Sequence, residues 1–239
     1  GTYMPLDPTW VPFCRELWSS AEQQQNYLPG VPEGSDLCIT PVSAPENHYV
    51  RIKADNRLEA DGTLRGTFTL TAEGQSDSNI RRIFTTGFQS EWKSTMERQL
   101  LAISPKARLL SVDYGKNPKD YQAAPIKITF RYEIPDYALK GEGEMFFRPM
   151  VMNNLYNQVR SYMWIDTSVE NRKYGFKDGC SRLVELDETI QLPAGYKLAS
   201  AAKDETMQGV GADFEGSLAQ QGNKVLLHNC LLYTSDAAD

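Results

Sequence analysis

The stretch YVRIKADNRLEADGTLRGTFTLTA, residues 49–72, decides the fold that this sequence predicts. Its first part, Tyr49 to Ala54, alternates apolar and polar side chains, which is the period of a half-buried β-strand. Residues 64–72 alternate in the same way, and the Asp61-Gly62 pair between the two parts is a strong turn signal. We therefore expect an antiparallel hairpin with one buried face and one face in water.

The same alternation recurs along the rest of the chain. In residues 126–134 the apolar even positions alternate with Lys127, Thr129 and Arg131. Shorter strand patterns, separated by turn residues, occupy 108–114, 143–148, 183–192, 196–200, 214–219 and 224–227. Many short strands with regular turns are typical of a β-sandwich. The expected fold class is mainly β, with an antiparallel β-sandwich region.

One segment, residues 90–103, departs from this pattern. Trp92, Met96 and Leu100 recur at helical spacing, and Pro105 follows the end of the segment. We expect one amphipathic helix that packs this apolar stripe against the sheet.

Composition limits the classes of function. The chain is 41% hydrophobic and 23% charged with a net charge of −6, as in a soluble globular protein. No apolar run reaches the length of a membrane span. A mildly acidic chain without a basic stripe argues against a nucleic-acid partner. A Cys14–Cys38 disulfide is an option in an exported protein, but buried free thiols are favoured.

The residues that could carry chemistry are few. His48 lies in a loop that opens a strand and His228 ends an apolar run, so we interpret both as structural. No spacing typical of a metal site occurs. The acidic pairs Glu142/Glu144 and Asp187/Glu188 are interpreted as solvated strand edges or turns. We therefore predict no metal and no cofactor, and no self-contained Cys/His enzyme.

The first residues carry a family resemblance. Tyr3-Met4-Pro5-Leu6-Asp7-Pro8-Thr9-Trp10 resembles the last catalytic strand of a transglutaminase-like, papain-type cysteine enzyme, in which Cys, His and Asp follow one another along the chain. Pro8 favours extended backbone at Asp7, which suits a carboxylate that orients a histidine. The resemblance implies that Asp7 is a triad residue. The Cys and the His would then lie before Gly1, so the chain itself is expected to be inactive.

The resemblance extends further along the chain. Residues 57–66 resemble a β-rich module of bacterial transglutaminase-like proteins, and residues 172–176 and 190–197 resemble their C-terminal module. The resemblance implies that residues 1–44 form the tail of the α+β enzyme core and a Pro/Gly-rich linker. A β-sandwich region would follow at 45–229, open to a division into two modules near 165–180.

The last residues form a separate case. Residues 230–239, which begin Cys230-Leu231-Leu232-Tyr233, resemble the in-frame translation of a sequencing adapter. We expect this tail to be an artefact of environmental DNA and the chain to be a fragment of a longer protein.

Two functional hypotheses follow. The first is a non-catalytic C-terminal part of a transglutaminase-like enzyme that acts on peptide or amide bonds, in the periplasm or outside the cell. Its partners would be the missing half of the enzyme core and a peptide or protein substrate. The alternative is a cell-surface β-sandwich that binds glycan or protein, with exposed aromatics such as Tyr162, Trp164 and Tyr174 as a platform.

Overall fold

The computed structural model describes residues 22–153, 173, 178–199 and 204–234. Its helical elements are η2 (Pro45–His48), α1 (Gly74–Thr85), η3 (Gln89–Glu91), α2 (Trp92–Leu101) and η4 (Met150–Asn153). Its strands are β1 (Asn26–Tyr27), β2 (Cys38–Ile39), β3 (Tyr49–Leu58), β4 (Leu64–Ala72), β5 (Arg108–Asp113), β6 (Ile126–Ile134), β7 (Leu139–Lys140), β8 (Met145–Phe146), β9 (Arg182–Gln191), β10 (Glu205–Gln208), β11 (Ala212–Gln221) and β12 (Lys224–Tyr233). The mainly β class predicted from the alternation is confirmed.

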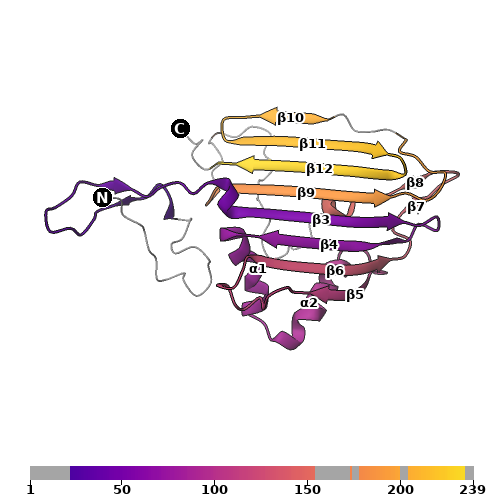
Figure 1. Ribbon diagram of the computed structural model, residues 1–239, viewed down its shortest axis with the longest axis horizontal. Helices are drawn as coiled ribbons and strands as arrows, with labels where there is room; N and C mark the ends of the chain where they lie inside the picture. Colours follow the sequence, from indigo (N-terminus) through magenta and orange to yellow (C-terminus); the bar gives the residue numbers. More distant parts are fainter. Residues whose placement is uncertain (1–21, 154–172, 174–177, 200–203, 235–239) are drawn as a thin grey trace.

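Eight strands form one large sheet in the order β10-β11-β12-β9-β3-β4-β6-β5 (Figure 1). Every neighbouring pair is antiparallel except β3 and β9, which run parallel at the centre of the sheet. The predicted hairpin is present as β3 and β4, with Val50 opposite Ala72 and Leu58 opposite Leu64. The short pairs β1–β2 and β7–β8 stand apart from this sheet.

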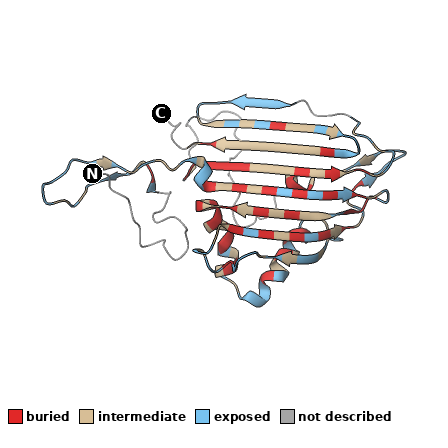
Figure 2. Cartoon of the chain, in the orientation of Figure 1, coloured by how far each residue is buried: buried red, intermediate tan, exposed pale blue. Residues whose placement is uncertain are grey.

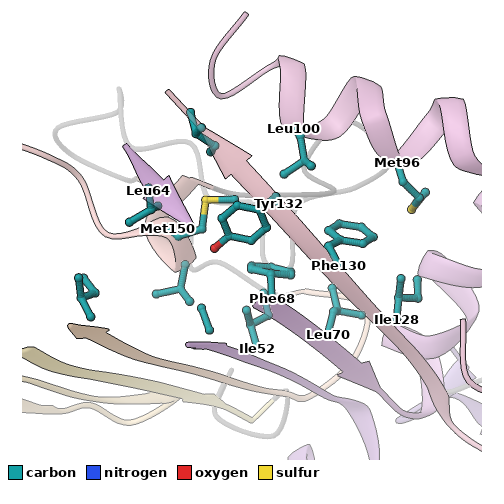
Figure 3. Packing of buried hydrophobic residues seen from close by; sticks show 14 of the residues in the cluster. Ile52, Leu64, Phe68, Leu70, Met96, Leu100, Ile128, Phe130, Tyr132 and Met150 are labelled. Carbon is teal, nitrogen blue, oxygen red and sulfur yellow. The ribbon is translucent and has the colours of Figure 1, made fainter. Parts of the chain in front are cut away.

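One face of the sheet, which we call the core face, is packed against the helices. Buried and less buried residues alternate along β3 and β6 (Figure 2). Their even-numbered side chains meet those of β4, where the Phe68 and Phe130 rings stack at 6.0 Å (Figure 3). Met96 and Leu100 from α2, with Phe84 from α1, join the same cluster. The predicted stripe at 90–103 is therefore confirmed as core.

The arrangement differs from the expected sandwich in two respects. The eight long-range paired strands form one mixed sheet rather than two facing sheets, because α1, α2 and η4 supply the apolar partner that a second sheet would supply in a sandwich. A second α-helix, α1, also appears where we predicted none. Its first half, Gly74 to Asn79, consists of weak helix formers apart from Gln75, so tertiary contacts rather than propensity maintain it.

A buried ion pair fixes α1 to the loop before β6. Arg81 donates to both carboxylate oxygens of Asp77, at 2.5 and 3.0 Å. Its other bonds reach the carbonyls of Pro118, Asp120 and Ala124, while Asp77 also accepts from the Ile126 backbone N–H at 2.6 Å. The pair thus satisfies polar groups that burial would otherwise leave unpaired.

The predicted boundaries are only partly covered by the structure. The division near 165–180 lies largely outside the described residues, and strands from before and after it, β3 and β9, pair in one sheet. Cys230 to Tyr233 continue β12, with partners on β9 and β11. In the described ranges, no helix is both long enough and apolar enough to cross a membrane.

Candidate functional site

The second face of the sheet, which we call the open face, carries the polar residues of the alternation. It consists of the odd-numbered side chains of β3, β4, β6, β9 and β11 and the even-numbered side chains of β12. Lys53 and Asp55 are exposed at its centre, and Asp187 and His228 are half-buried beside them. These side chains can therefore meet a ligand without any movement of the backbone.

A groove of about 390 Å³ lies on this face where β3, β9 and β12 meet. Lys53, Ala54 and Asp55 line it from β3, Asp187, Glu188 and Thr189 from β9, and Leu226 and Leu227 from β12. Successive strand residues point to opposite faces, so the side chains that a ligand meets are those of Lys53, Asp55, Asp187, Thr189 and Leu226. The groove thus offers an amine, two carboxylates, a hydroxyl and an apolar patch.

A carboxylate–imidazole pair borders the groove. Asp187 Oδ1 lies 2.7 Å from His228 Nδ1, and the two residues are direct register partners on β9 and β12. An ionised carboxylate only accepts hydrogen bonds, so His228 Nδ1 is the donor in this contact. The side chains of Asp187 and His228 are 41% and 38% exposed, which leaves them accessible to a ligand.

Ser217 of β11 lies opposite His228, so Ser, His and Asp follow one another across three neighbouring strands. This composition is that of a hydrolase triad, but a triad also needs donors for the oxyanion. The N–H groups of a sheet lie in its plane and point at neighbouring strands, not at a ligand above the face. The arrangement can bind and orient a ligand, but it supplies no oxyanion hole from the sheet backbone.

The Cys230 thiol beside this pair is a poor nucleophile. Cys230 follows His228 by two residues on β12, on the same face. Burial and the carboxylates of Glu185, Glu215 and Asp187 raise the pKa of the Cys230 thiol. Since only the thiolate attacks, this site disfavours cysteine catalysis.

Charge is divided across the open face at the junction of β9 and β3. On the β3, β4, β6 and β5 side, basic residues outnumber acidic ones: Arg51, Lys53, Arg57, Arg65, Arg108, Lys127 and Arg131 stand against Asp55, Asp113 and Glu133. On the β9, β12 and β11 side, acidic residues dominate: Glu185, Asp187, Asp213 and Glu215 stand against Lys224. We call these the basic half and the acidic half.

The interpretation of Asp187/Glu188 as a solvated edge or turn was wrong. Both lie in the middle of β9, a central strand, and Glu188 points into the core face with 2% exposure. Its carboxylate accepts from Asn56 Nδ2 at 2.7 Å and from the Val151 backbone N–H at 3.0 Å. Burial raises the pKa of Glu188, and these bonds oppose that rise. Glu142 and Glu144 do lie at the turn between β7 and β8.

His48 is not a loop-edge histidine either. It is fully buried at the end of η2, and its Nδ1 accepts from the backbone N–H of Gln75 at the start of α1. Burial, aided by the charge of Arg182, lowers the pKa of His48 to about 4. A neutral imidazole that caps a helix has a structural role, as the sequence predicted, though in the core.

The remaining predicted site residues lie outside the described part of the chain. These are Asp7, Cys14, Tyr162, Trp164 and Tyr174. Cys38 is half-buried in β2 and Cys180 is buried before β9, and neither forms a disulfide. Within the described ranges, no group of three or more His, Cys, Asp or Glu residues is arranged to hold a metal ion.

The open-face features were missed because they depend on strand order. Asp187 and Glu188 point to opposite faces because they are successive residues of β9, but only the pairing of β9 with β12 brings Asp187 to His228. Comparison of the chain with protein-family models, curated proteins and solved structures finds no match.

Proposed function

We propose that this chain is a non-catalytic protein-binding domain, which recognises its partner with the open face of the sheet around the groove beside Asp187 and His228. The observation that carries the proposal is the open face itself, where charged and hydrogen-bonding side chains surround a groove. Because the sheet backbone is occupied by its own ladder, recognition falls to these side chains. A charged, accessible surface of this kind suits a polar protein segment.

Peptide binding tests whether the open face recognises charged protein segments. Fluorescence anisotropy of a labelled Glu-rich peptide and a labelled Lys-rich peptide should rise on titration with the chain, whereas a Gly/Ser peptide should show no change. The double variant Lys53→Gln/Lys127→Gln should bind the Glu-rich peptide more weakly and should bind the Lys-rich peptide as well as the wild type does. If neither charged peptide binds the monomeric chain at low salt, the open face is not a site for charged protein segments.

Hydrolysis assays test the proposal that the chain is non-catalytic. Chromogenic ester and amide substrates should be turned over no faster by the chain than by its His228→Gln variant, because the pair lacks oxyanion donors. Turnover that disappears in His228→Gln would show that the Asp187–His228 pair is catalytic.

We further propose, on the resemblance around Asp7, that the domain serves a transglutaminase-like enzyme in the periplasm or outside the cell. In that arrangement the parent forms a thioester through a cysteine and a histidine encoded before Gly1, and this chain contributes Asp7 and the binding face. Genomic sequence upstream of the codon for Gly1 decides this part. A reading frame without a Cys followed by a His would remove the enzyme and leave the binding domain.

A further inference from the structure

We propose that the partner on the open face is a second copy of this chain, with the two sheets face to face around a two-fold axis parallel to the strands. The proposal rests on the open face being a protein-binding surface and names its partner. A two-fold interface brings the same surface of both copies together, so the surface must be complementary to itself. The division of charge on the open face gives it that property.

The boundary between the acidic half and the basic half lies where a two-fold axis parallel to the strands requires it. The β9–β3 junction has four strands on each side (Figure 1). An axis along this junction and parallel to the strands places β9 over the partner's β3, β12 over its β4, and β11 over its β6. The acidic half of each copy then covers the basic half of the other. An axis perpendicular to the strands would place like charges together, which costs free energy.

The register of the sheet sets opposite charges at the same height. Glu215, Glu185, Arg51 and Lys127 belong to one row of register partners across the sheet. In the two-fold arrangement, Glu215 therefore faces the partner's Lys127, and Glu185 faces the partner's Arg51. In the next row, Asp187 is the register partner of Lys53, so Asp187 faces the partner's Lys53.

These charges are available for such contacts. In the described part of the chain, Lys53, Lys127 and Glu215 take part in no ion pair. Arg51 and Glu185 pair within one copy, and a facing pair would make a cluster of four alternating charges. Each contact occurs twice by symmetry.

The area of the face also fits. Eight strands spaced about 4.8 Å apart, each with about eight residues that rise about 3.3 Å, give roughly 900 Å² per copy. A standard stable interface buries about 800 Å² per partner. Aligned packing of two sheets, close to parallel in strand direction, is also a common geometry.

A charge exchange tests the dimer. One variant reverses the basic half, Lys53→Glu/Lys127→Glu, and the other reverses the acidic half, Asp187→Lys/Glu215→Lys. Analytical ultracentrifugation of the wild type should show a dimer at low salt that dissociates at about 1 M salt, where the Debye length is about 3 Å. Each variant alone should be monomeric, since like charges face each other. A mixture of the two should form a heterodimer.

Two controls make the result decisive. Lys93→Glu/Lys106→Glu changes the net charge as much as Lys53→Glu/Lys127→Glu does, but at exposed positions on α2 and the turn after it, so it should remain dimeric. Circular dichroism should show that all variants are folded. A wild type that stays monomeric at low salt while still binding the Glu-rich peptide would overturn the dimer and leave the binding function in place. Folded exchange variants that do not associate on mixing would equally overturn it, and a chain that neither binds nor self-associates would overturn both.

Discussion

His48 caps the first turn of α1: its Nδ1 lies 3.1 Å from the backbone nitrogen of Gln75, which donates to it. Ser76 on the same turn donates to the His48 carbonyl at 2.8 Å, so the two segments are bonded twice. An imidazole accepts a hydrogen bond only while it is neutral. The start of α1 is therefore coupled to the protonation state of a buried side chain.

Acid should destabilise the protein through His48. The pKa of His48 is about 4 in the folded chain and about 6.5 when unfolded, so the unfolded state binds more protons between these values. The stability that neutral His48 provides is complete above pH 6.5 and is lost as the pH falls towards 4, by about 3 kcal/mol. Urea unfolding at several pH values measures this slope.

The matched variant is His48→Asn, whose Oδ1 can take the place of Nδ1 as acceptor and which does not titrate. The difference in unfolding free energy between wild type and variant should shrink as the pH falls from 6.5 to 4. A constant difference would show that His48 remains neutral or is accessible in both states.

The buried ion pair of α1 should be costly to break. Arg81→Gln removes the cation that neutralises Asp77 and leaves the carbonyls of Pro118 and Ala124 without their donor. Breaking one side of a buried pair typically costs about 3–5 kcal/mol. Arg82→Gln, at the next and exposed position, should change the unfolding free energy by less than about 0.5 kcal/mol. Similar losses in both variants would contradict a special role for Arg81.

These contacts explain why the sequence predicted one helix but not the other. The stripe Trp92, Met96 and Leu100 has helical period and faces the core, so α2 could be found from local pattern. In α1 the first turns are polar, and the helix is fixed by His48, by the Asp77–Arg81 pair and by Phe84 in contact with Trp92. His48 lies far from Gln75 in sequence, and the core-facing positions in the first turns of α1 are the polar residues Ser76 and Asp77, so an apolar stripe marks only its second half.

The strands likewise show that local sequence pattern predicts an element but not its neighbours in the sheet. Period-two alternation located β3, β4, β6 and β9, and it gave the polar face of β3, β4 and β6. It could not give their order, because β9 pairs with β3 only after a long crossover. Glu188 looked solvated for this reason: its burial depends on the order of the strands and on η4, whose Val151 donates to it.

Gly66 should not tolerate a side chain. A Cβ at this position would lie 1.9 Å from Asn56 Oδ1 and 2.4 Å from the Asp55 carbonyl oxygen. Gly66→Ala must displace Asn56, which accepts from Tyr132 and donates to Glu188, so we expect a loss of at least about 2 kcal/mol. Thermal unfolding measures the loss. Gly30→Ala, where a Cβ meets nothing within 4 Å, is the control and should be close to neutral.

The last prediction concerns the contact between Asn56 and Glu188, whose Nδ2 and Oε1 lie 2.7 Å apart in the core. Asn56→Asp keeps the shape and replaces the donor by a carboxylate oxygen. Two carboxylates at this distance cannot both be charged, so at pH 7 we expect a loss of about 3 kcal/mol or more. The loss should be measured as unfolding free energy in urea.

The pH dependence distinguishes charge repulsion from simple misfit. In the folded variant the carboxylate pair retains a shared proton at a pH where the unfolded carboxyls are ionised, so its folded pKa is raised. The folded state then binds more protons than the unfolded state, and the stability deficit relative to wild type should shrink as the pH falls from 7 to 5. Asn79→Asp, on α1 at a partly exposed position, should show no such recovery. A deficit in Asn56→Asp that does not change with pH would mean that lost packing, not the facing carboxylates, destabilises the variant.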